Sequence, residues 1–106
     1  MLGWMIIVSK ESDDKAELVR WETSNPMVNW LTPLKAEGVI QMVYNGGGYP
    51  NKYIVKAGDL FPIILNDDVI FDENNFGHSR DIKRNAQAIE GCQPDEMLCV
   101  EMWDLS

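Results

Sequence analysis

Two apolar segments near the start of the chain have the pattern of β-strands. Residues 4–8 (WMIIV) are apolar at every position, which predicts a strand buried on both faces. Residues 16–23 (AELVRWET) alternate, with Val19 and Trp21 on one face and charged residues on the other. A short helix is the alternative for this second segment, because alanine and glutamate favour helices.

The next segment carries a helix-start signature. Ser-Asn-Pro at 24–26 places a capping side chain directly before a proline, which favours the first turn of a helix. Apolar residues continue at helical spacing, and Gly38 supplies a stop. Because Pro33 interrupts the run, we expect a kink or two short helical turns, the second capped by Thr32.

A glycine-rich loop joins two further predicted strands, at 39–44 (VIQMVY) and 52–56 (KYIVK). Since strand-like runs flank the three glycines at 46–48, the loop is predicted to be a long hairpin connection. Three glycines exceed what a tight turn requires, so we expect a mobile tip. Tyr44 and Tyr49 bracket the glycines and are hard to bury there.

The second half of the chain continues the mixture of strands and helices. After a turn, residues 61–65 (FPIIL) and 69–71 (VIF) predict a short hairpin. Ser79 can cap a helix over about 80–90, whose buried stripe contains isoleucine and alanine at helical spacing. Residues 97–103 (MLCVEMW) alternate like a strand.

These elements predict an α+β fold. The order of strands and helices is typical of a mostly antiparallel sheet of about five or more strands, with two short helices covering one face. A length of 106 residues fits a single globular domain over 1–106.

The net charge of −8 is unevenly distributed along the chain. Residues 1–58 contain six lysines and arginines and six carboxylates, whereas residues 59–106 contain three against eleven. A negative field repels nucleic acids and anionic membranes and attracts basic partners. We therefore expect a protein partner, and neither a nucleic acid nor a membrane.

The start of the chain and its cysteines favour a cytoplasmic protein. No basic region precedes the apolar opening and no small-residue cleavage site follows it, so it predicts a strand and not a signal peptide. No apolar run approaches the ~20 residues that span a bilayer. Cys92 and Cys99, the only two cysteines, are expected to be reduced thiols.

Residue patterns for catalysis, metal binding and cofactor binding are missing from the sequence. The glycines at 46–48 precede a strand, whereas a phosphate-binding loop precedes a helix. His78 is the only histidine, and neither cysteine is near it in sequence. Ser79, adjacent to it, is expected to be a helix cap and not a nucleophile. We expect no enzyme, no metal and no cofactor.

Two acidic segments and two tyrosines are the candidate contact residues for a partner. The segments are 66–77 (NDDVIFDENNFG) and 90–99 (EGCQPDEMLC). Carboxylates steer a basic partner, and tyrosines are enriched at interfaces. The predicted contact residues are Tyr44, Tyr49, Asp67, Asp68, Asp72, Glu73, Asp95 and Glu96.

With its two acidic segments on a small scaffold, the chain resembles the small cytoplasmic immunity proteins that neutralise bacterial toxins. These include the immunity proteins of contact-dependent growth inhibition systems. The resemblance is one of type and covers no aligned segment. It implies a non-catalytic antitoxin that binds a basic, nuclease-type toxin domain and masks its active site or substrate groove with carboxylates.

Three alternatives stay open at the level of sequence. The first is a small enzyme or ligand-binding domain with a site near the glycines at 46–48 and His78, which requires a deep pocket containing His78 and a carboxylate. The second is an acidic inhibitor that mimics nucleic acid, which requires carboxylates spaced along one extended face. The third is a structural subunit that self-associates through an exposed strand edge.

Overall fold

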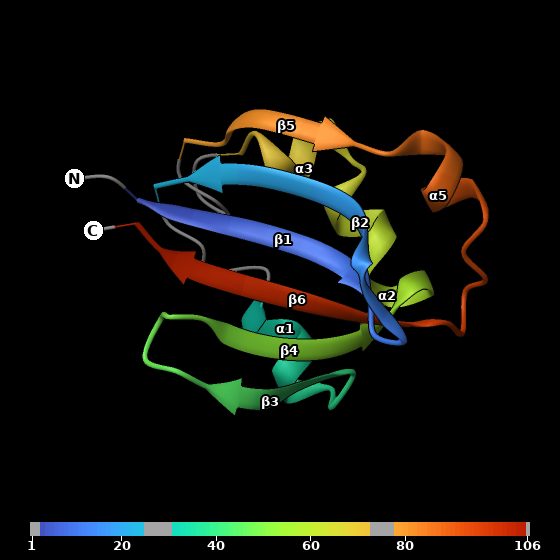
Figure 1. Cartoon of the computed structure of the whole chain (residues 1–106), viewed down its shortest axis with the longest axis horizontal. Helices are drawn as coiled ribbons and strands as arrows, with labels where there is room; N and C mark the ends of the chain where they lie inside the picture. Colours follow the sequence, from blue (N-terminus) through green and yellow to red (C-terminus); the bar gives the residue numbers. More distant parts are fainter. Residues whose placement is uncertain (1–2, 25–30, 73–77, 106) are drawn as a thin grey trace.

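One six-stranded antiparallel sheet organises the fold (Figure 1). The computed structural model describes residues 3–24, 31–72 and 78–105. The strands are β1 (Trp4–Lys10), β2 (Asp13–Thr23), β3 (Ile40–Asn45), β4 (Asn51–Lys56), β5 (Arg80–Arg84) and β6 (Met97–Asp104). The helices of the described residues are α1 (Leu31–Ala36), α2 (Ala57–Ile64), α3 (Asp67–Ile70) and α5 (Ala86–Glu90). The predicted α+β class is confirmed, with four short helices in this part of the chain where the sequence indicated two.

The strand order places β6, the last strand, inside the sheet and leaves β3 and β5 at its edges. The order is β3-β4-β6-β1-β2-β5, and all neighbours are antiparallel (Figure 1). Leu98, Val100 and Met102 alternate along β6 and are buried, as the sequence pattern predicted. The order also brings the turn between β1 and β2 next to the start of β6, where the Glu11 N–H donates to the Met97 carbonyl over 3.1 Å.

The hydrophobic core lies on one face of the sheet, against α1, α2 and α3 (Figure 1). Ile6 and Val8 of β1, Trp21 of β2 and Val55 of β4 point into it and are fully buried. The helices contribute Leu34, Ala57, Leu60, Ile64 and Ile70. Burial of these apolar side chains, at roughly 25 cal/mol per Å², is the main force that holds the two layers together.

The opposite face of the sheet, called the open face below, has no described helix packed on it (Figure 1). Met5 and Ile7 of β1 point to this face and are partly exposed. The prediction that residues 4–8 are buried on both faces is therefore wrong, because the described helices cover one side of β1 only.

The predicted hairpin over 61–65 and 69–71 is wrong, because these residues form α2 and α3. Leu60 and Ile64 are spaced one helical turn apart and both reach the core. This packing outweighs the strand preference of the Ile-Ile pair and the presence of Pro62 inside α2. α3 begins at Asp67 because the Asn66 side chain accepts the Asp68 N–H over 3.0 Å.

The predicted helix over 80–90 is also wrong in its first half. Residues 80–84 are β5, which pairs with β2, and α5 begins only at Ala86. Its cap is Asn85, whose side chain accepts the Ala88 N–H, and not Ser79. The edge of β2 offers β5 a ladder of hydrogen bonds, a tertiary contact that the local pattern does not reveal.

Of the two predictions made for the ends of this helix, one can be compared with the structure. The predicted helix start at 24–26 falls largely outside the described residues, since they resume at Leu31. The predicted stop is confirmed at Gly38, which has a φ of 74° after α1 and is followed by a hydrogen bond from the Val39 N–H to the Leu34 carbonyl.

Candidate functional site

The charged side chains of the open face are arranged in ion pairs. Arg20 donates to Glu17 with a shortest distance of 2.6 Å. This hydrogen bond raises the pKa of the Arg20 guanidinium. Two more pairs join neighbouring strands: Lys52 lies 3.6 Å from Glu101 and Arg80 lies 3.5 Å from Glu22. The carboxylates of these pairs are balanced locally, so the open face contributes little to the acidic surplus.

Apolar side chains fill the space between these pairs. Met5, Ile7, Trp103 and Leu105 line a hollow of about 210 Å³ on the open face. The Trp103 indole N–H donates to Glu101 over 3.0 Å, which holds the ring at one wall. The open face is therefore nearly neutral and partly apolar.

Part of the negative charge gathers instead at one end of the sheet, called the acidic end below. Backbone hydrogen bonds join its three segments: besides the bond from Glu11 to Met97, the Ala57 N–H donates to the Glu96 carbonyl over 2.9 Å and the Gly58 N–H to the Pro94 carbonyl over 2.8 Å. The acidic end comprises Glu11, Asp13, Asp59, Asp95 and Glu96, with Lys10 and Lys56 among them.

Lys10 and Glu96 form an ion pair within the acidic end. Their charged atoms lie 3.4 Å apart, and both side chains are partly exposed. Glu11, Asp59 and Asp95 are exposed. The chain thus brings carboxylates from the β1–β2 turn, α2 and the segment before β6 into one exposed region.

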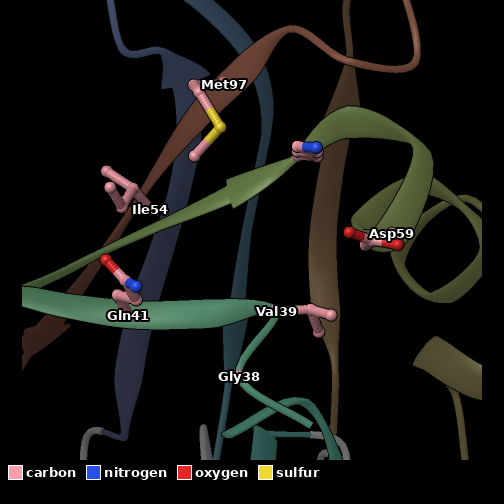
Figure 2. Close-up of a pocket in the computed structure, with 7 residues that line it drawn as sticks. Gly38, Val39, Gln41, Ile54, Asp59 and Met97 are labelled. Atoms are coloured by element: carbon pink, nitrogen blue, oxygen red, sulfur yellow. The ribbon is translucent and has the colours of Figure 1, made fainter.

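A hollow of about 280 Å³ opens beside the acidic end, between β3, β4 and the start of α2 (Figure 2). Val39, Ile54 and Met97 give it apolar walls. Gln41 and Asp59 place an amide and a carboxylate on opposite sides of it (Figure 2). Lys56 also lines the hollow, so a cation and a carboxylate both stand beside its apolar walls. These walls suit the apolar stem of a long side chain, and Asp59 can pair with a cationic head.

The pKa of the Cys92 thiol is affected by charged groups of the acidic end. Burial raises the pKa of its thiol, the Glu96 carboxylate raises this pKa further, and Lys10 lowers it. The thiol also donates to the Ala88 carbonyl over 3.4 Å. Cys92 is therefore held in the neutral thiol form, which disfavours nucleophilic chemistry at this position.

The structure does not gather the predicted acidic contact residues on one surface. Asp95 and Glu96 belong to the acidic end. Asp67 and Asp68 lie in the first turn of α3, in the helical layer next to β5 (Figure 1). Asp72 follows α3, and Glu73 lies outside the described residues.

The acids of α3 have a structural role. Asp67 accepts a hydrogen bond from Arg84 of β5 over 2.8 Å. Asp68 lies beside it at the helix start, where a carboxylate interacts favourably with the backbone N–H groups. Charge at this position stabilises α3 whether or not a partner binds.

The two predicted tyrosines flank the glycines between β3 and β4, at the other end of the sheet from the acidic end (Figure 1). Tyr44 is the last residue but one of β3 and its ring lies beside Gly46, while Tyr49 follows the glycines and is 59% exposed. The expected mobile tip is instead a loop tied to β6. Gly48 is buried, and its carbonyl accepts the Asp104 N–H over 2.7 Å.

Sequence reasoning missed some residues of the acidic end and some of the exposed residues around Tyr44. Glu11 and Asp59 join Asp95 and Glu96 only through the strand order, which no local pattern discloses. Met42 and Val43 are exposed beside Tyr44 because β3 is an edge strand. The apolar run at 39–44 predicts a strand, but it does not distinguish an edge strand from a central one.

The residues considered for catalysis or metal binding lie apart from these surfaces. His78 is exposed, its backbone N–H donates to the Ser24 hydroxyl over 2.9 Å, and it lines neither of the two hollows described above. Within the described ranges, no three His, Cys, Asp or Glu side chains lie close enough to hold a metal ion. No helix of those ranges is long and apolar enough to cross a membrane.

No protein-family model, curated protein or solved structure matches this chain significantly.

Proposed function

We propose that the chain is a non-catalytic, protein-binding inhibitor of the immunity type, which neutralises a basic, nuclease-type bacterial toxin domain in the cytoplasm. The observation that carries the proposal is the acidic end. There, carboxylates from three separate segments lie close together, beside a hollow with apolar walls that Asp59 and Lys56 also line. The proposed partner is a protein surface rich in lysine and arginine.

The physical argument has two parts. Clustered exposed carboxylates create a field that steers a basic protein and speeds its encounter, an effect that salt screens. Affinity then requires a few well-packed contacts, and the apolar walls of the hollow beside Asp59 and Lys56 offer one for a long side chain of the partner. Masking the basic groove of a nuclease in this way blocks access of its nucleic-acid substrate.

Two of the three alternatives considered from sequence have less support. A nucleic-acid mimic requires carboxylates spaced along one extended face, whereas Glu17, Glu22 and Glu101 of the open face pair with cations. The enzyme hypothesis requires a deep pocket that contains His78 and a carboxylate. Neither of the two hollows described above includes His78.

The test begins with the gene directly upstream of this chain's gene in its source genome. We expect its product to be a basic toxin that arrests growth when expressed alone and to be neutralised when this chain is co-expressed. A metabolic enzyme at that position, or growth arrest that this chain does not relieve, would contradict the proposal.

The contact surface is tested by the association rate of the purified pair at low salt. The double variant Asp59→Lys, Asp95→Lys is expected to slow association about tenfold or more, because it reverses charge at the acidic end. The matched variant Asp67→Lys, Asp68→Lys makes the same charge change on α3. Because it also removes the ion pair with Arg84, its circular dichroism is first compared with that of the wild type, and the folded variant is expected to slow association much less. Equal effects of the two variants would show that net charge, and not the acidic end, attracts the partner.

A further inference from the structure

We infer that β3 is a self-association edge, at which two copies of this chain pair antiparallel and join their sheets into one. The inference stands on the two edges of the sheet and does not depend on the proposed function. It concerns β3 and its outward-facing backbone.

The edge at β3 is unusually accessible. Its six residues carry no charge, and all except Ile40 are exposed. Met42, Val43 and Tyr44 have 40%, 54% and 53% of their surfaces exposed. Apart from the ladder with β4, no backbone hydrogen bond among the described residues involves residues 40–45. An uncharged apolar edge with free backbone groups is a template for another strand.

The opposite edge has the features that prevent such pairing. Four of the five residues of β5 are charged, and Asp81 has a φ of 55°, which breaks the extended backbone. Charge and the break in the extended backbone at Asp81 protect this edge. The sheet therefore has one edge that can accept a strand.

The lack of charge on β3 suits a second copy as its occupant. No like charges meet when β3 pairs with itself, and β3 has no carboxylate that would attract a basic partner, although the net charge of −8 on each copy keeps the association weak. β3 begins at the acidic end and ends at Asn45, beside the loop that contains Tyr49 (Figure 1). An antiparallel twofold axis sets the acidic end of each copy beside the tyrosines of the other, whereas parallel pairing would place the two acidic ends together.

The interface between the two β3 strands would be small, and the association of the two copies would be reversible. A six-residue strand is roughly 20 Å long. The register shift between Met42 and Tyr44 leaves Val43 without a partner on β4, so its side chain is available to the second copy. Such an interface lies at the low end of the size range for protein complexes, where association is weak. Both acidic ends stay exposed, so each copy keeps its own contact surface.

The experiment is sedimentation velocity of the whole chain over a range from about 5 μM to about 500 μM, chosen to cover weak association. The weight-average mass of the wild type is expected to rise above 12.1 kDa as concentration increases. Val43→Lys is expected to stay at the monomer mass throughout, because it buries a charge at the joint. Gln87→Lys, which makes the same charge change on exposed α5, is expected to behave like the wild type.

A folding control and three contrary outcomes complete the test of self-association. If Val43→Lys does not match the circular dichroism and thermal melting of the wild type, Tyr44→Lys replaces it at the same edge. A wild type that is monomeric at every concentration overturns the inference, as does a dimer that survives the β3 substitution. A monomer whose β3 amides become protected only when the toxin is added also overturns it, in favour of pairing with the toxin.

Discussion

The two edge strands of the sheet, β3 and β5, differ in what they offer to another molecule. β3 is uncharged and exposed at every residue except Ile40, whereas β5 is charged and has an irregular backbone at Asp81. Arg84 of β5 donates to the Ile64 carbonyl of α2 and to Asp67 of α3. Side-chain charge and backbone geometry together therefore decide which edge of this fold is available for contact.

The edges also differ in what holds them in place. β5 is linked to β2 by the ion pair between Arg80 and Glu22 and to the helices by Arg84. β3 depends on its ladder with β4 and on the glycine loop that joins the two strands. Substitutions in these supports test whether each edge is held as described.

The largest expected effect is at the loop that supports β3. In Gly46→Ala, the new Cβ would clash with the Pro50 carbonyl and lie 2.8 Å from the Tyr44 ring, so the backbone must shift. We expect a loss of about 2–3 kcal/mol in the free energy of unfolding, measured by urea denaturation.

The matched control for this substitution is Gly91→Ala, after α5 on the β5 side of the fold. Gly91 has a φ of −78°, and a Cβ there would meet its nearest neighbour at 3.6 Å, an ordinary contact. The control is expected to leave stability unchanged or raise it slightly, by up to about 1 kcal/mol. Equal losses for the two variants would show that the loop does not specifically support β3.

A smaller loss of stability is expected on substitution of Arg84, which links β5 to the helical layer. Arg84→Ala removes the 2.8 Å ion pair with Asp67 and the hydrogen bond to the Ile64 carbonyl. Because both side chains are partly exposed, we expect a loss of about 1 kcal/mol by urea denaturation. The neighbouring exposed residue gives the control: Lys83→Ala is expected to change stability by less than about 0.5 kcal/mol. An Arg84→Ala variant as stable as this control would mean that β5 is not pinned by Arg84.

The smallest effect is expected at the irregular point of β5. Asp81 has a φ of 55°, which glycine adopts without steric penalty. Asp81→Gly is expected to raise the free energy of unfolding by about 0.5 kcal/mol, read from thermal melting. Asp81→Asn, which removes the same charge but keeps a side chain, separates the backbone effect from the charge effect. If Asp81→Asn raised the free energy of unfolding as much as Asp81→Gly, the gain would come from the loss of charge and not from the backbone.

Local patterns predicted the strands well, because burial in this sheet follows alternation. Leu98, Val100 and Met102 alternate in the sequence and are buried in β6. The patterns failed where a tertiary contact outweighs local preference. Residues 80–84 have helical spacing around Ile82, but pairing with β2 makes them a strand.

The candidate site could be predicted only in part, because strand order assembles it. The sequence pointed to Asp95 and Glu96 through local acidity, and they lie at the acidic end. Glu11 and Asp59 join them because β1 and β4 both neighbour β6. The open edge at β3 has the same origin, since an apolar run indicates a strand but not its position in the sheet.

The difference between the edges is tested most directly by hydrogen exchange of the backbone amides at two protein concentrations. The account predicts that residues 42–44 of β3 exchange more slowly at the higher concentration, while residues 80–84 of β5 exchange at an unchanged rate. β3 amides that do not respond to concentration, or β5 amides that slow to the same degree, would contradict it.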